Sequence, residues 1–241
     1  MKVFVIPDVH LKPWMFEKAD DLLSRDKYDR IVFLGDLVDD WDQQLNEALY
    51  DRTFQAAIDF VKTHQNMLFC YGNHDASYIW EAKETGYSPV MRELILKMFD
   101  ELKSALSREN TAFVHRIDNV MFSHAGVTTF YVEYFLKQEL KNEEVKLDDI
   151  IKRINTFGRD EMWVVESPIW VRPQDGRLEM YGDGIMQVVG HTPVKKPLET
   201  KVYNDYILTL DTFSTYSGGD PIGDQRFVWI DTEKQMWEYA D

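Results

Sequence analysis

The 241 residues suffice for one elaborated domain with a sizeable core, and an apolar fraction of 44% excludes a disordered chain. A net charge of −15 argues against a protein that binds extended nucleic acid or a membrane surface. No stretch reaches the ~20 apolar residues of a membrane span, and no signal peptide is expected before the first predicted strand, so we expect a cytoplasmic protein.

Short apolar runs and amphipathic segments alternate through the first half of the chain. Three apolar runs predict buried strands, at 3–6, 31–34 and 67–71. The amphipathic segments predict helices at 14–25, 44–64 and 90–106, the last of them opened by Ser88-Pro89. The first two strands and the helix between them predict a βαβ unit with parallel strands. Cys70, the single cysteine, lies in the third run and is expected to be a small buried residue.

The second half of the chain is more varied. Residues 114–126 predict a hairpin that turns at Asp118-Asn119, and MQVV at 186–189 predicts a further strand. From Thr128 to about Met162 the sequence is helical and charged, and we expect this excursion to lie over the active face. Residues 167–176 predict a loop. Three last runs predict consecutive antiparallel strands that close a second sheet, at 206–212, 226–232 and 235–240. We expect a single domain over 1–241.

Five of the predicted strands end at residues that can bind metal ions. These residues are Asp8 and His10, Asp36, Asn73, His124, and His191. In open α/β sheets, ligands bind outside the carboxyl ends of the strands. One fold can therefore bring all of these side chains together, although they lie far apart in the sequence.

Carboxylates, imidazoles and an amide oxygen suit Mn²⁺, Fe or Zn²⁺, whereas Ca²⁺ prefers oxygen ligands alone. Asp8 and His10 alternate along a segment that we expect to be extended, so both can reach one ion. Asp36 can bridge two ions, and the coordination shell of the second ion is completed by Asn73, His124 and His191. Two cations about 3.5–4 Å apart hold the attacking and departing oxygens of a phosphoryl centre and lower the pKa of a bridging water. We expect two divalent cations, Mn²⁺ first and Fe, Zn²⁺ or Ni²⁺ as alternatives.

Two residues beside this group suggest acid catalysis. His74 follows Asn73 and points away from it if the loop is extended, so it is free to protonate a leaving oxygen. Asp39 lies one short loop away and can hold the imidazole in the right tautomer and keep it charged.

Each motif taken singly has an ordinary structural explanation. Asp-x-His is usually a turn beside a surface histidine, Gly-Asn-His-Asp is often only a turn, and a lone His124 or His191 is more often a hydrogen-bonded core residue than a ligand. All five motifs lie at strand ends, and this coincidence favours the metal site.

The motifs together resemble the signature blocks of the calcineurin-like metallophosphoesterases. The matching blocks are Asp8-x-His10, Gly35-Asp36-x-x-Asp39, Gly72-Asn73-His74-Asp75, His124-Ala125-Gly126 and Gly190-His191-Thr192. The chain is most similar to the phosphoprotein phosphatase branch, which includes bacteriophage protein phosphatases and symmetrical diadenosine tetraphosphatases.

The resemblance implies an α/β (α+β) fold of two mixed β-sheets packed face to face and flanked by helices. It also implies that the first metal is bound by Asp8, His10 and Asp36, and the second by Asp36, Asn73, His124 and His191. By the same resemblance His74 is the general acid, and Asp39 orients it.

The chain departs from the family pattern in two places. Pro7 precedes Asp8 and Leu11 follows His10, where the family usually has glycine. Asp40 stands where the branch has an arginine that grips the substrate phosphate, so a doubly charged monoester is expected to be held less well than a diester. Arg172 is the best replacement for phosphate contact, followed by Arg159, for which an ordinary surface role is favoured.

The leading hypothesis is a serine/threonine phosphatase-like phosphoric ester hydrolase, in which a metal-bridging hydroxide attacks phosphorus. The first alternative is a symmetrical diadenosine tetraphosphatase or another nucleotide phosphohydrolase or phosphodiesterase. The second is a metal-bearing binding module without catalysis, and a nuclease fits the charge poorly. We therefore expect a phosphorylated protein or nucleotide as the partner, and no association with a membrane. Tyr78 and Trp80 can stack on a nucleobase, although packing beneath the excursion is favoured.

Overall fold

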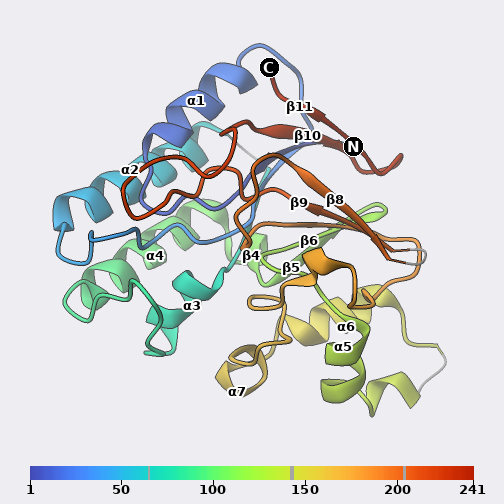
Figure 1. Ribbon diagram of the computed structural model, residues 1–241. Coiled ribbons are helices and arrows are strands. Elements are labelled where there is room, and N and C mark those ends of the chain that lie inside the picture. The colour runs from blue at the N-terminus through green and yellow to red at the C-terminus, as the bar shows by residue number, and fades with distance from the viewer. Residues whose placement is uncertain (65, 142–143, 203–204) are drawn as a thin grey trace.

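The computed structural model describes residues 1–64, 66–141, 144–202 and 205–241, and two mixed β-sheets form its centre (Figure 1). In spatial order, the strands of the first sheet are β11 (Met236–Tyr239), β10 (Val228–Asp231), β1 (Lys2–Ile6), β2 (Arg30–Phe33), β3 (Met67–Cys70) and β4 (Thr111–Ala112). Those of the second are β5 (Val114–Ile117), β6 (Val120–Ser123), β7 (Met186–Val189), β9 (Asp205–Thr209) and β8 (Leu198–Val202).

Strand direction determines at which edge of each sheet the strand ends lie. Strands β1 to β4 are parallel neighbours, and β7 is parallel to both β6 and β9, so the carboxyl ends within each group lie at one edge. The βαβ unit of the first two strands is confirmed. The hairpin of β5 and β6 is also confirmed, and Asp118 adopts a left-handed φ of 50° at its turn.

The two sheets share one apolar layer because side chains alternate along each strand. Val3 and Val5 of β1 pack with Phe122 of β6 and Val188 of β7 between the sheets. Cys70 is fully buried in this layer, as expected, and burial raises the pKa of its thiol.

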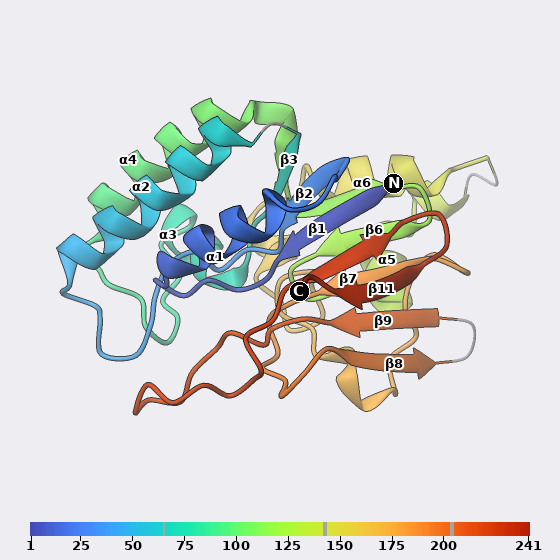
Figure 2. The ribbon, with the colours of Figure 1, turned by 90° about the horizontal axis from the view of Figure 1, so that it is seen from above.

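The other face of the first sheet packs against helices α1 (Trp14–Leu23), α2 (Glu47–Thr63) and α4 (Arg92–Leu106), which lie together on one side (Figure 2). Phe4 and Ile6 of β1 point into this second core. The shorter helices are α3 (Asn73–Ile79), α5 (Thr129–Phe135), α6 (Leu147–Ile154) and α7 (Arg159–Met162), and 3₁₀ turns occur at Arg108–Asn110, Glu139–Lys141 and Pro173–Asp175. The expected architecture of two mixed sheets flanked by helices is confirmed.

Helix α2 begins later than the sequence pattern indicates. Asn46 is its N-cap, and the side chain of Asn46 accepts a hydrogen bond from the Leu49 N–H at 3.3 Å. Leu45 lies within the predicted helix but precedes the cap, and it is 75% exposed.

The prediction for the last three strands is wrong. β9 joins the second sheet, but β10 and β11 form a hairpin in the first sheet, where β10 is antiparallel to β1. The pairing partner of a strand depends on which sheet edge is free, and local sequence does not report this. Strands β4 and β8 were not anticipated.

The excursion at 128–162 does not cover the active face. Its helix α6 lies against β5, and Asn155 just beyond this helix binds the backbone of β5. Asn155 accepts the Val114 N–H at 2.9 Å and donates to the Val114 carbonyl at 2.8 Å. None of the described residues of the excursion lines the cavity beside His10, Asp36 and His191.

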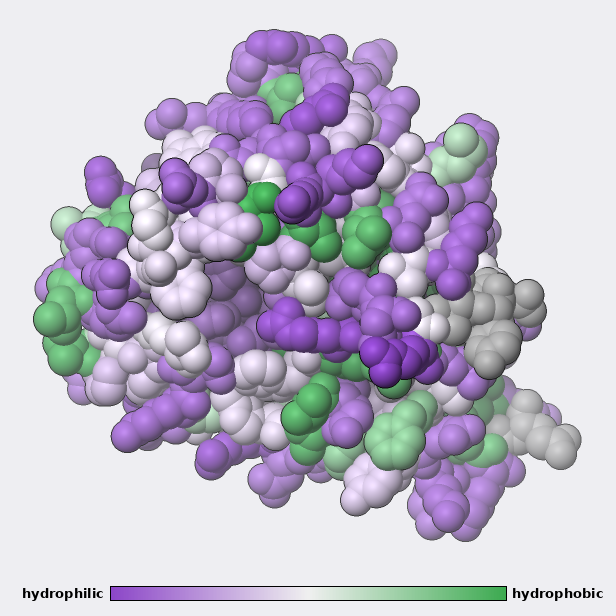
Figure 3. All heavy atoms as spheres, viewed as in Figure 1, coloured by the Kyte–Doolittle hydropathy of each residue, from purple (hydrophilic) through white to green (hydrophobic). Residues whose placement is uncertain are grey.

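The face in Figure 3 is mostly hydrophilic, with apolar side chains in separate small groups. Among the helices that the structure describes, none combines the length and apolar composition needed to cross a bilayer.

Candidate metal centre

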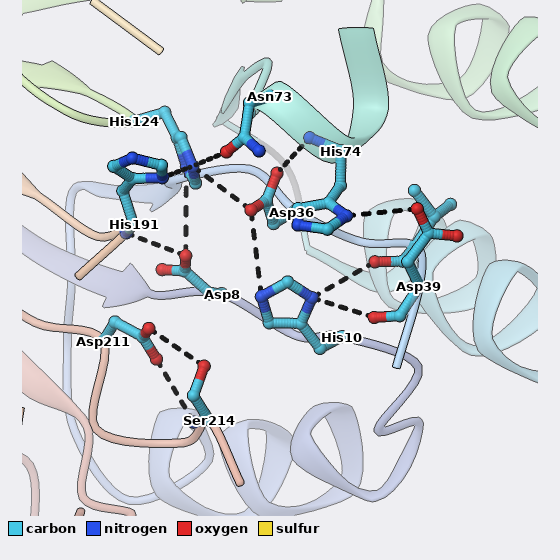
Figure 4. Close-up of polar contacts among 12 residues, drawn as sticks. Asp8, His10, Asp36, Asp39, Asn73, His74, His124, His191, Asp211 and Ser214 are labelled. Atoms are coloured by element: carbon cyan, nitrogen blue, oxygen red, sulfur yellow. Dashed lines mark hydrogen bonds and ion pairs between the residues drawn. The ribbon is translucent and has the colours of Figure 1, made fainter. Parts of the chain in front are cut away.

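The strand ends singled out in the sequence meet at one place (Figure 4). Asp8, Asp36, Asn73, His124 and His191 are each at most 5% exposed there. His10 is half-buried and lies at the border between this cluster and a cavity of ≈ 520 Å³.

The segment that carries Asp8 and His10 is a turn, not the extended strand that was expected. The N–H groups of Val9 and His10 both donate to the carbonyl of Asp36, at 3.0 and 2.9 Å. To reach it, His10 and Leu11 adopt left-handed φ angles of 43° and 55°. Such angles are uncommon for residues with side chains, and the contacts with the neighbouring strand end stabilise them.

Two glycines allow the carboxylates to approach the backbone. A Cβ atom on Gly72 would lie 2.0 Å from Asp36 Oδ1, and one on Gly190 would lie 2.0 Å from Asp8 Oδ2. Only glycine leaves room for these side chains, so a larger residue in either motif would clash with a carboxylate.

Asp75 ties the second and third strand ends together. Its carboxylate accepts the N–H groups of Asp36 at 2.8 Å, Leu37 at 2.9 Å and Gly72 at 3.0 Å. The sequence analysis gave Asp75 no role. Its position three residues after the N-cap Gly72 is the signal that could have identified it.

Three imidazoles are oriented by backbone carbonyls on their outer side. His10 Nδ1 lies 2.9 Å from the Asp39 carbonyl, His124 Nδ1 lies 2.8 Å from the Leu34 carbonyl, and His191 Nε2 lies 3.1 Å from the Trp170 carbonyl. A carbonyl only accepts, so each of these nitrogens donates a proton. The opposite nitrogen of each neutral ring then presents a lone pair to the centre, as in metal-binding histidines.

Acceptor atoms converge on that centre. His124 Nε2 lies 3.2 Å from Asp36 Oδ2, 3.0 Å from Asn73 Oδ1 and 3.1 Å from His191 Nδ1. Asp8 Oδ1 accepts the His191 N–H at 2.8 Å, and its buried Oδ2 has no hydrogen-bond partner among the described residues. A buried orphan carboxylate oxygen and converging lone pairs fit divalent cations.

The donor atoms form two groups that share Asp36. One contains His10, Asp36 and His74, the other contains Asp36, His124 and His191, and the ligand atoms within each group lie within 4.8 Å of one another. Imidazole and carboxylate donors of this kind can hold divalent cations.

Burial and nearby charges shift the pKa values of these residues in different directions. Burial, assisted by Asp211 and Asp36, raises the pKa of Asp8. Burial lowers the pKa of His10 to about 4, whereas Asp36 outweighs the opposing burial and raises the pKa of His124 to about 9. Metal binding would release the proton that this raised pKa favours on His124 and leave the neutral ring, whose Nε2 lone pair faces the centre.

His74 lies in the first turn of α3, because this segment is helical rather than extended. Its Nδ1 lies 3.1 Å from Asp39 Oδ2, and Asp36 and Asp39 raise its pKa to about 9 against the effect of burial. Tyr50 and Tyr78 donate to the other oxygen of Asp39, at 2.8 and 2.5 Å.

Tyr78 is fully buried with its ring centroid 4.6 Å from that of Tyr87, so it packs in the core while its hydroxyl binds Asp39, and stacking on a base is excluded. The ring of Trp80 contacts those of Phe113 and Trp163, with centroids 5.7 and 6.3 Å away.

The cavity contains two cationic side chains besides histidine among its described lining residues, Lys12 and Arg172. Arg172 Nη1 donates to the His191 carbonyl at 3.0 Å and to Thr192 Oγ1 at 2.9 Å. Arg159 is exposed on α7 and does not line this cavity. Lys12, which the sequence analysis did not single out, binds Asp40 Oδ2 at 3.2 Å.

Comparison with known proteins places the chain in a family. Residues 1–195 match the model of the calcineurin-like phosphoesterases, whereas no curated protein matches. A protein serine/threonine phosphatase from Saccharomyces cerevisiae is 13% identical with a TM-score of 0.53, over 99% of this chain and 79% of that one. An archaeal phosphodiesterase is 14% identical over 99% and 98%, with a TM-score of 0.46.

The E. coli phosphoesterase structure is 13% identical over 98% of this chain and 96% of that one, with a TM-score of 0.44. At 13% identity the phosphatase structure with a TM-score of 0.53 shows only a shared fold, and the family match rests on the sequence. The chain therefore belongs to the calcineurin-like phosphoesterases and is a metal-dependent phosphoester hydrolase.

Proposed function

We propose that the protein is a phosphatase with two divalent cations, Mn²⁺ being the first choice. Asp8, His10 and Asp36 hold the first cation, and the second is held by Asp36, Asn73, His124 and His191. The observation that carries this proposal is the pair of donor groups that share Asp36. His74 also belongs to the first group, and we assign it to proton donation because Asp39 binds its Nδ1. When bound, the cations supply Lewis acidity to the phosphoryl oxygens and lower the pKa of a water.

The chain's own residues divide the remaining work. Asp39 accepts the Nδ1 proton of His74 and keeps the imidazole charged, so that the Nε2 proton can be donated to the leaving oxygen. Arg172 binds a phosphoryl oxygen from the cavity wall, where its contacts with His191 and Thr192 fix its position.

Turnover of phenyl phosphate with Mn²⁺ tests the proposal. We expect activity in the wild type, and loss of activity in His74→Asn while calorimetry shows that Mn²⁺ is still bound. An inactive wild type that binds Mn²⁺ would instead support the non-catalytic binding module.

A nucleotide substrate is the second candidate, because Trp41 and Trp170 line the cavity and can stack on a base. A panel of phosphopeptides, diadenosine tetraphosphate and cyclic nucleotides with Mn²⁺ separates the two substrate classes. Hydrolysis of the dinucleotide alone would remove the phosphoprotein substrate from the proposal.

A further inference from the structure

Lys12 is an interior cation at the active cavity. It ends the turn that carries Asp8 and His10, where its N–H donates to the Val9 carbonyl at 3.1 Å and Pro13 then leads into α1. The residue is only 6% exposed, yet it lines the cavity beside Asp36. A lysine is almost never this buried unless it is paired.

The Lys12 ammonium has two partners. Nζ donates to the His10 carbonyl at 3.1 Å and to Asp40 Oδ2 at 3.2 Å. The other oxygen of Asp40 accepts the Trp41 N–H at 2.8 Å, which holds this carboxylate in place. An ammonium carries three donors, so these contacts leave one N–H for a further acceptor.

Lys12 and Arg172 have corresponding places in the site. Each donates to the backbone carbonyl of a candidate metal ligand, Lys12 to His10 and Arg172 to His191. Each therefore stands beside one of the two donor groups. Both side chains also line the cavity that a substrate phosphoryl group would enter.

Asp40 adds a competing negative charge at the same point. Its Oδ2 binds the ammonium through a charge-assisted contact of the kind that a phosphoryl oxygen would make. The cavity also contains Asp42 and Glu84, so its wall is otherwise rich in acid. Asp40 thus opposes the binding of an anion to Lys12.

We propose that Lys12 binds a non-bridging oxygen of the substrate phosphoryl group, and that Asp40 competes with this oxygen for the ammonium. This inference rests on the proposed phosphatase function and adds a substrate-binding residue and a residue that weakens phosphate affinity. Lys12 thereby supplies the positive charge that is missing at position 40, where the related branch has an arginine.

The test is the dissociation constant of inorganic phosphate, measured by calorimetry on the Mn²⁺-loaded full chain. We expect Lys12→Met to weaken binding about tenfold, and Asp40→Asn to strengthen it several-fold. Lys62→Met and Asp59→Asn are matched controls, because this ion pair of 3.7 Å lies exposed on α2. Neither control is expected to change phosphate binding.

Opposite changes in phosphate affinity in the two variants distinguish substrate binding from a structural ion pair. If the pair only stabilises the turn, both variants weaken phosphate binding, and that result overturns the inference, as do unchanged constants. Asp40→Asn retains the lysine, so the direction of its change in phosphate affinity decides between the two explanations if Lys12→Met fails to fold. Phenyl phosphate turnover by the wild type with unchanged constants would refute only the role of Lys12, whereas a wild type without turnover or phosphate binding would refute both proposals.

Discussion

His74 Nδ1 lies 3.1 Å from Asp39 Oδ2, and the second oxygen of Asp39 accepts hydrogen bonds from two buried tyrosines. The carboxylate is therefore fixed by Tyr50 and Tyr78 before it orients the imidazole. This rigid support is consistent with the proposed role of His74 as a proton donor.

The loss caused by His74→Asn should depend on the leaving group. Phenolate needs a proton more than 4-nitrophenolate does, so we expect kcat to fall by about 10²–10⁴ for phenyl phosphate and by much less for 4-nitrophenyl phosphate. Steady-state kinetics at saturating Mn²⁺ measure both values. Equal losses on the two substrates would contradict a role in proton donation.

Gly190→Ala should weaken metal binding. The new Cβ would lie 2.0 Å from Asp8 Oδ2 and must displace that carboxylate. We expect the affinity for Mn²⁺ to fall by at least about tenfold, as measured by calorimetry. Gly218→Ala is the control because no atom lies within 4 Å of its Cβ position, and an unchanged affinity in both variants would argue against Asp8 as a ligand.

Tyr78→Phe should destabilise the fold by about 1–3 kcal/mol, since buried partners are left unsatisfied. The hydroxyl of Tyr78 donates to Asp39 Oδ1 and accepts the Ser88 N–H at 2.8 Å. Urea unfolding gives the free energy difference. Tyr134 is exposed on α5, so Tyr134→Phe should leave the free energy of unfolding nearly unchanged. A similar loss of stability in both variants would contradict the importance of these contacts.

Stability should decrease as the pH falls below about 6.5, in part because of His115. Burial lowers the pKa of His115 below its ordinary 6.5, so the unfolded state binds the proton more readily than the folded state. Each such group adds a slope of up to about 1.4 kcal/mol per pH unit. Urea unfolding of the wild type and His115→Gln with a chelator, between pH 5 and 7, should show a shallower slope in the variant. Parallel curves would contradict this assignment.

The sequence was informative where the chemistry follows a strand end. Asp36, His124 and His191 come directly after or within two residues of buried runs, and parallel pairing of β6 with β7 brings the ends that carry His124 and His191 to one edge. Their meeting with Asp36 depends also on how the two sheets pack and on the left-handed φ angles of Asp36 and His191.

Other features depended on contacts that no local pattern reports. His10 was assigned to an extended segment, because nothing in its neighbours indicates that the Asp36 carbonyl will bend the chain. Tyr50 and Tyr78 approach Asp39 from two different helices, α2 and α3, and Lys12 meets Asp40 across two turns. These are tertiary relationships, and the residue types alone do not select them.

The carbonyl of Asp36, which accepts two N–H groups from the neighbouring turn, has a consequence for tolerance to change. A replacement of the side chain at this position deletes one charge but preserves the main-chain scaffold for His10. An insertion or deletion between Gly35 and Leu37 would instead shift that oxygen out of register and disarrange both halves of the site at once. This position is thus constrained twice, in chemical identity by the carboxylate that both donor groups share and in length by the carbonyl that holds the neighbouring turn.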